Sequence, residues 1–122
     1  MSGVMSKRQF VDALADRMLD VSGETRALDN PPGRSPSPDL VALSEWFRDL
    51  DRDDRAMAVE LMRWMAYGTL HGALCVLDGV AAIEGGPAKG QLRLLHESHD
   101  GVIVDLTYQA EPMLHDLLAE RR

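Results

Sequence analysis

The chain has 122 residues, 20 acidic and 13 basic side chains, and a formal net charge of −7. A single domain over residues 1–122 is expected, because this length suffices to bury a hydrophobic core without disulfides. The acidic balance argues against a nucleic-acid partner, since the two densest basic clusters lie at the two ends of the sequence. The one cysteine excludes an intramolecular disulfide, and no signal peptide is recognisable, so a cytoplasmic location is expected.

The N-terminal part is predicted to contain one helix followed by a loop. Ser6 and Gln9 match a capping box, and apolar residues recur at helical spacing after them, which predicts a helix over residues 7–21. Residues 23–38 hold four prolines and two glycines without any period. This segment is predicted to be a mobile loop, with ordering against a partner as the alternative.

Two further helices are predicted to follow with almost no connection between them. Ser37 and Pro38 mark the start of the second helix as cap and first helical residue. The third helix is predicted over residues 52–84, with Gly85-Gly86-Pro87 ending it. Its segment from Trp64 to Ile83 contains one acid, one histidine and no lysine or arginine. This segment is not apolar enough for a membrane span, because it contains glycine, threonine, histidine and aspartate.

The third helix is predicted to be a central, buried helix. Its residues from 57 onward are apolar on most faces, which is typical of a helix surrounded by other elements. Gly68 and Gly72 lie four residues apart, so a neighbouring backbone is expected to approach closely there. One narrow polar stripe remains along the helix: Glu60, Arg63, Tyr67, His71 and Asp78.

Near the C-terminus the hydrophobic period changes to two on both sides of His99-Asp100-Gly101, which predicts a β-hairpin. A two-residue turn and a three-residue loop give different registers. The three-residue loop pairs His96 with Val104 and collects the apolar residues on one face, so it is the predicted register. A short helix with an apolar face is predicted after Pro112. The predicted fold is therefore α+β and mostly α, with two N-terminal helices packed on a long central helix, a C-terminal hairpin and a short terminal helix.

No set of residues predicts catalysis, a metal site or a cofactor. Asp78 has no evident acid–base partner, and the apolar neighbours of Cys75 indicate a buried, unreactive thiol. His96 and His99 are expected to point apart on the hairpin, and His115 diverges from Asp116 on its helix, so no metal site is predicted. If the chain binds a small molecule, the pocket is expected beside Tyr67, His71 and Asp78.

The surface that points most clearly to a partner precedes the third helix. Between Asp39 and Glu60 there are seven acids and three arginines, with Trp46 and Phe47 among them. An aromatic residue within a charged rim is typical of protein interfaces, although amphipathic helices with both rings in the core give the same pattern. The residues assigned to partner binding are Trp46, Asp49, Asp51, Asp53 and Asp54.

Three classes of function remain from the sequence. The first is a small, acidic, non-catalytic protein-binding protein of the immunity-protein or antitoxin kind, which masks the basic surface of a partner such as a toxin. The alternative is a small-molecule-binding or regulatory domain, with an enzyme as the third class. The sequence does not define the oligomeric state.

Overall fold

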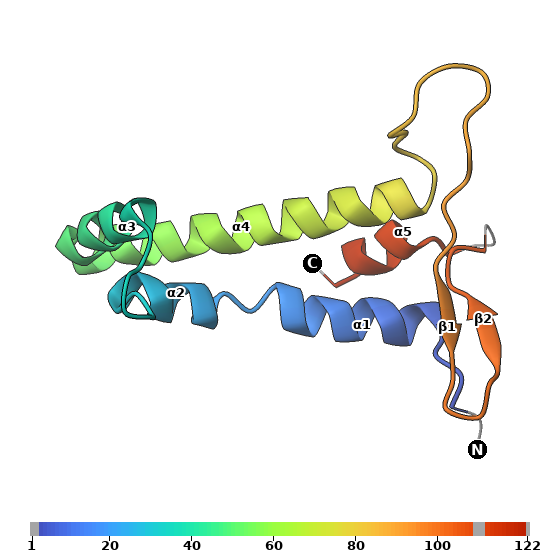
Figure 1. Ribbon diagram of the computed structural model, residues 1–122, viewed down its shortest axis with the longest axis horizontal. Coiled ribbons are helices and arrows are strands. Elements are labelled where there is room, and N and C mark those ends of the chain that lie inside the picture. The colour runs from blue at the N-terminus through green and yellow to red at the C-terminus, as the bar shows by residue number, and fades with distance from the viewer. Residues whose placement is uncertain (1–2, 109–111, 122) are drawn as a thin grey trace. The chain divides into compact units, whose positions relative to one another are not determined.

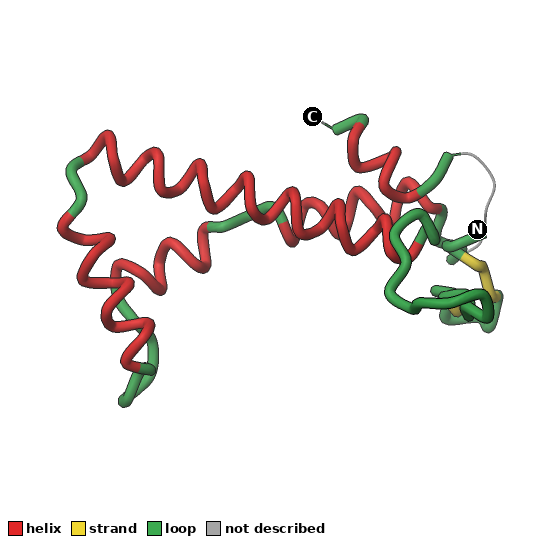
Figure 2. Tube along the Cα trace, turned by 90° about the horizontal axis from the view of Figure 1, so that it is seen from above, coloured by secondary structure: helices red, strands yellow, loops and turns green. Residues whose placement is uncertain are grey.

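The computed structural model describes residues 3–108 and 112–121 of the chain. The described residues form a mostly helical α+β fold with a long helix, a C-terminal hairpin and a short terminal helix, as predicted (Figures 1 and 2). In chain order the elements are α1 (Lys7–Met18), α2 (Ser22–Asp29), α3 (Pro38–Asp49), α4 (Arg52–Leu77), β1 (Leu95–Glu97), β2 (Ile103–Asp105) and α5 (Leu114–Ala119).

The chain divides into two compact units, to both of which α4 contributes. One unit is Met18–Tyr67, with α2, α3 and the first part of α4. The other combines Met1–Arg17 with Gly68–Arg122 and holds α1, the end of α4, the hairpin and α5. The single domain over residues 1–122 stays a prediction.

The start of α1 follows the predicted capping box. The Ser6 hydroxyl accepts a hydrogen bond from the Gln9 amide at 3.1 Å, and the Ser6 amide donates to Oε1 of Gln9 at 2.9 Å. These two bonds satisfy backbone donors that the first turn of a helix leaves without partners. The helix ends at Met18 and not at the predicted residue 21, and it buries Val11 and Ala15.

The predicted loop over residues 23–38 is wrong in its first half, where α2 forms over Ser22–Asp29. All four prolines and the second glycine of that segment lie after Asn30. The residues before them are compatible with a helix, but the composition averaged over the whole segment did not show this. Glu24 lies in the first turn, where an acid complements the helix dipole. The Thr25 hydroxyl donates to the Val21 carbonyl at 2.9 Å.

In the unit of residues 18–67, Phe47 is the centre of the packing. Its side chain is fully buried, and the guanidinium of Arg55 lies 5.0 Å from the centre of its ring. Arg55 also contacts Asp29 at 3.3 Å and donates to the Arg48 carbonyl, so one side chain of α4 connects to α2 and α3. The Ser44 hydroxyl donates to the Leu28 carbonyl, which joins α3 to α2. The predicted cap of α3 is confirmed, because Ser37 Oγ accepts from the Leu40 amide at 3.2 Å.

Helix α4 ends at Leu77, seven residues before the predicted end at residue 84. Gly79 has a φ of 79°, a left-handed conformation that glycine adopts readily. Its amide donates to the Val76 carbonyl at 3.1 Å, and the Val80 amide donates to the Cys75 carbonyl at 3.0 Å. These two bonds are the Schellman termination of a helix, so Gly79 ends α4 and the later Gly85-Gly86 pair does not.

The expectation that other elements surround α4 on most sides is not met by the described residues. Only Leu70 and Leu74 of this helix are buried. Large apolar side chains along α4 remain more than half exposed: Met57, Leu61, Trp64 and Met65.

The hairpin has the predicted register. His96 pairs with Val104, the Ser98 amide donates to the Val102 carbonyl at 2.8 Å, and Gly101 takes the left-handed conformation with a φ of 86°. Leu95 and Ile103 lie on the exposed face, whereas Leu106 and Ser98 are buried. The strands are only three residues long each, shorter than the alternating segments of the sequence.

Helix α5 provides much of the core of its unit. The fully or almost fully buried apolar side chains there are Val11, Ala15, Leu70, Leu74, Leu106, Leu114, Leu117 and Leu118. Exposed ion pairs join α1 to the end of the chain: Arg121 contacts Asp12 at 2.8 Å and Asp16 at 2.7 Å, and Arg8 contacts Glu120 at 3.0 Å. At the surface such pairs each contribute less than about 1 kcal/mol, so apolar burial holds α1 in place.

Candidate functional sites

Asp78, directly after α4, binds the start of α5. Its side chain is almost fully buried, with 4% of the residue exposed. Oδ1 accepts a hydrogen bond from the Leu114 amide at 3.1 Å, and Oδ2 accepts from the His115 amide at 2.8 Å. Met113, at the N-cap of α5, makes no side-chain cap hydrogen bond. Asp78 therefore caps a helix that lies far from it in the sequence and complements the dipole of that helix.

A cluster of ionisable side chains surrounds this carboxylate, and we call it the Asp78 cluster: Asp78, His115, His71 and Cys75. His115 Nδ1 lies 2.7 Å from Asp78 Oδ2, and the His115 and His71 rings meet edge to face with centroids 5.7 Å apart. Cys75 Sγ lies 3.7 Å from His71 Nδ1, one helical turn away on α4. The structure thus joins His71 and Asp78 of the predicted polar stripe through His115, which the sequence analysis had not connected to them.

The chemistry of the Asp78 cluster favours a structural role. Burial raises the pKa of the Cys75 thiol, and the nearby negative charges of Asp78 and Asp116 raise that pKa further. A thiol with a raised pKa is protonated at neutral pH, whereas a cysteine nucleophile requires the thiolate. The carboxylate of Asp78 is engaged by two main-chain amides as well as by His115. Catalysis at this cluster is accordingly the weakest of its interpretations.

The raised pKa of Cys75 leads to a first expected result. Iodoacetamide should alkylate Cys75 more slowly in the native protein than in urea, with the rate profile shifted to higher pH, because each unit of pKa lowers the thiolate fraction about tenfold. Replacing Asp116 with asparagine should move the native profile toward lower pH. The free energy of unfolding should fall as the pH rises through the raised pKa, since the fold favours the protonated thiol. Identical native and denatured profiles would contradict this result.

No group of three or more histidine, cysteine, aspartate or glutamate side chains is placed to hold a metal ion within residues 3–108 and 112–121. His96 and Val104 face the buried side of the hairpin, whereas His99 lies in the exposed turn. The two histidines thus diverge, as their spacing predicted. The absence of a metal site and of a cofactor stays a prediction.

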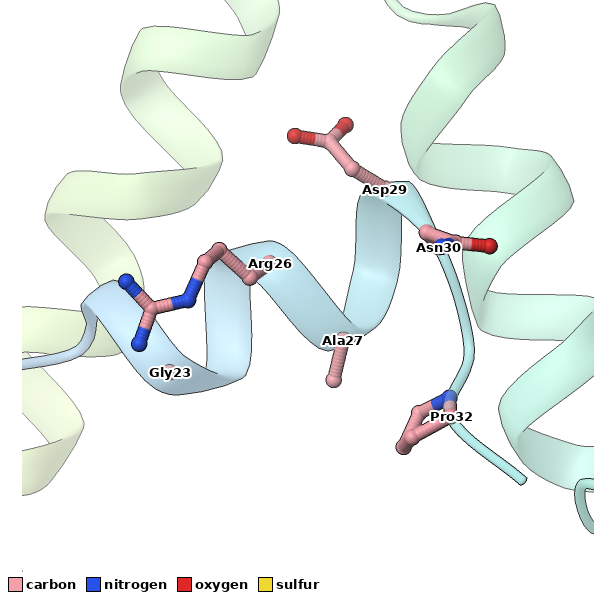
Figure 3. A pocket seen from close by; sticks show the side chains of 6 residues that line it. All are labelled: Gly23, Arg26, Ala27, Asp29, Asn30 and Pro32. Atoms are coloured by element: carbon pink, nitrogen blue, oxygen red, sulfur yellow. The ribbon is translucent and has the colours of Figure 1, made fainter.

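Three cavities are lined by residues other than those of the Asp78 cluster. The largest of them, of about 460 Å³, is lined by α2 and the segment after it (Figure 3). The second, of about 350 Å³, lies between the start of α2 and Val59 and Arg63 of α4. The third, of about 90 Å³, lies in the segment after α4. Tyr67 is half-buried, one turn before His71 on α4, and the ligand pocket proposed beside these residues stays a prediction.

The residues assigned to partner binding lie around the corner between α3 and α4. Trp46 is 55% exposed, which rejects the alternative that its ring belongs to the core, whereas its neighbour Phe47 is buried. Asp49 is exposed one turn after Trp46 on α3, and Asp53 and Asp54 are exposed in the first turn of α4.

Asp51 has a different part in this corner. Its Oδ1 accepts a hydrogen bond from the Asp54 amide at 2.8 Å, which caps the start of α4. Substitution of Asp51 would therefore change stability as well as surface charge. We define the acidic corner as Trp46, Asp49, Asp53 and Asp54, and treat Asp51 as its structural support.

Comparison of the chain with protein-family models, with curated proteins and with solved structures gave no match. In the part of the chain that the structure describes, no helix combines the length and the apolar character needed to cross a membrane.

Proposed function

We propose that this chain is a small acidic protein-binding protein, of the immunity-protein or antitoxin kind, that covers a basic surface of a protein partner. The observation that supports this proposal is the exposed Trp46 ring on α3, followed by exposed acids at the end of α3 and in the first turn of α4. Among the described residues, the structure gives no ion pair to Asp49, Asp53 or Asp54.

The physics of association explains why such a corner suits a basic partner. Aromatic side chains contribute much of the affinity at interfaces when a partner excludes water from them. Unpaired acids around such a ring attract a basic surface and accelerate association, by tenfold to a thousandfold at low salt. The net charge of −7 acts in the same direction.

The small-molecule alternative has less support. The buried carboxylate of Asp78 already accepts hydrogen bonds on both oxygens from the start of α5. A ligand that used this carboxylate would have to displace main-chain amides, which would then lose their partners inside the protein.

Charge reversal at the acidic corner tests the proposal. The tagged chain should capture a basic protein stoichiometrically from a lysate of the source cells, and added salt should weaken the complex. With that partner purified, the Asp49→Lys/Asp53→Lys variant should associate at least about tenfold more slowly than the wild type. Trp46→Ala should mainly accelerate dissociation, since it removes apolar contact and leaves the charge unchanged.

The matched control is the Glu84→Lys/Glu97→Lys variant, which makes the same change in net charge at exposed positions outside the corner. It should retain most of the wild-type association rate. If both variants associated equally slowly, the change in net charge alone would explain the lower association rate. An unchanged association rate in the corner variant would reject the acidic corner as the interface.

A further inference from the structure

The segment between α4 and β1 is long and carries no helix or strand (Figure 1). Every residue from Gly79 to Arg93 is exposed. Within the described part of the chain, residues 82–93 make no hydrogen bond between main-chain groups, and the Gly90 amide reaches only Oε2 of Glu84, at 3.4 Å. We call residues 82–93 the exposed segment. Because it has few bonds to lose, it can open locally at little cost in free energy.

Lys89 lies within the exposed segment and is one of only two lysines in the sequence. The other lysine, Lys7, donates hydrogen bonds to the carbonyl oxygens of Tyr108 and Pro112. Lys89 has no ion pair among the described residues, and the residues on both sides of it in the sequence are small. Exposed loops of small and polar residues are the preferred sites of proteolytic cleavage in folded proteins. Lys89 is thus an accessible basic side chain in a segment that a protease can bind.

Proteolysis of a folded protein depends on the length of chain that can leave the native structure. An endopeptidase binds its substrate as an extended strand, through main-chain N–H and C=O groups on both sides of the bond that it cuts. Those groups must be free of native hydrogen bonds, so elements such as α4 resist cleavage until they unfold. The exposed segment offers such groups on both sides of Lys89, with only the long Gly90 contact to release.

Arg34 and Arg93 are the two other basic residues in the loops between the helices and strands, and both are placed less favourably. Arg93 contacts Asp105 at 3.0 Å and borders the hairpin. Arg34 is exposed, but the described residues without main-chain hydrogen bonds around it are only 31–36. They include three prolines, against one in the exposed segment, and proline lacks the N–H group that pairing with a protease requires. Lys89–Gly90 is therefore the bond expected to be cut first.

We propose that the exposed segment is a cleavage site for an endopeptidase that cuts after basic residues, and that Lys89–Gly90 is the bond cut first. The protease adds water across this peptide bond, which leaves a carboxylate on Lys89 and a terminal amino group on Gly90. This chain supplies only the substrate for the reaction. The site shares no residue with the acidic corner and is independent of the proposed function.

The cut would leave residues 90–122 held by non-covalent contacts alone. Both pieces contribute buried apolar side chains to this unit: Val11, Ala15, Leu70 and Leu74 before the cut, and Leu106, Leu114, Leu117 and Leu118 after it. Asp78 also accepts hydrogen bonds from two amides at the start of α5, so the two pieces should stay together at high concentration. A short connection within one chain corresponds to an effective concentration of about 1 mM, so at about 1 μM the cut weakens their association about a thousandfold. Cleavage thus makes the hairpin and α5 releasable.

Limited digestion of the native full chain with trypsin tests the site. Mass spectrometry should identify residues 1–89 and 90–122 as the first products. Lys89→Gln should slow the first cut at least about tenfold, because the remaining sites lie in hydrogen-bonded elements or in a shorter loop. The matched control is Arg34→Gln, which removes the basic residue of that shorter loop and should leave the rate of the first cut unchanged. A first cut at any other residue, or an equal rate in Lys89→Gln, would overturn the proposal.

Size-exclusion chromatography of the cut protein tests the release. The two pieces should elute together at about 100 μM and separate increasingly on dilution to about 1 μM, as the partners of a bimolecular complex do. The uncut wild type should release nothing at any concentration, because its two parts remain covalently joined. Immediate degradation of either piece after the first cut, or a cut protein that stays whole at every concentration, would contradict a releasable segment.

Discussion

Replacing Asp78 with alanine is expected to lower the free energy of unfolding by about 3–5 kcal/mol. The carboxylate is buried and accepts three hydrogen bonds, from the Leu114 amide, the His115 amide and the His115 ring. Alanine would leave both amides of the first turn of α5 without a partner inside the protein. Urea unfolding followed by circular dichroism measures the loss, and amide hydrogen exchange should show the earliest loss of protection in α5.

Asp116→Ala is the control for this result. Asp116 also approaches His115, at 3.3 Å from Nε2, but its side chain is 50% exposed. Its removal should cost less than about 1 kcal/mol, because solvent screens exposed pairs. If Asp78→Ala were as mild as Asp116→Ala, the capping of α5 by Asp78 would contribute little to stability.

The features predicted correctly from the sequence depend on residues that are neighbours in the chain. The cap of α1 needs only Ser6 and Gln9, and the cap of α3 needs Ser37 and the residues after it. The register of the hairpin follows from a three-residue loop and from the need to bury one alternating face. In each case the deciding contact spans only a few residues.

The wrong boundaries had equally local causes. Helix α2 was missed because the prolines that follow Asn30 dominated the composition of the whole segment. The end of α4 was placed too late because Gly85-Gly86-Pro87 gave a stronger stop signal than Gly79 alone. An aspartate followed by a glycine was the available signal for the earlier end.

The Asp78 cluster could not be predicted, because its central contact joins residues 37 positions apart. From the sequence, Asp78 lacked a partner, and His115 was considered only beside Asp116. Only the folding of the segments after α4 brings α5 to the end of that helix. The exposure of α4 was also not predicted, since a helix that is apolar on most sides is expected to be surrounded by other elements, whereas Leu70 and Leu74 are its only buried residues.

The neighbouring residues Phe47 and Trp46 are expected to respond oppositely to the same substitution. Phe47→Ala should lower the free energy of unfolding by about 3–5 kcal/mol, because it empties the centre of its unit and removes the ring that Arg55 contacts. Trp46→Ala should change stability by less than about 1 kcal/mol, because that ring is more than half exposed. Circular dichroism in urea compares the two without relying on tryptophan fluorescence.

The comparison also separates stability from binding at the acidic corner. A Trp46→Ala variant that folds normally and yet releases the partner faster would place the exposed ring in the interface. A large loss of stability in Trp46→Ala would instead show that this ring contributes to the packing of the protein. The acids near it would then be only the solvated side of a helix corner. Because the two residues are adjacent on α3, any general effect on the helix should appear in both variants. The difference between them therefore isolates what each ring contacts.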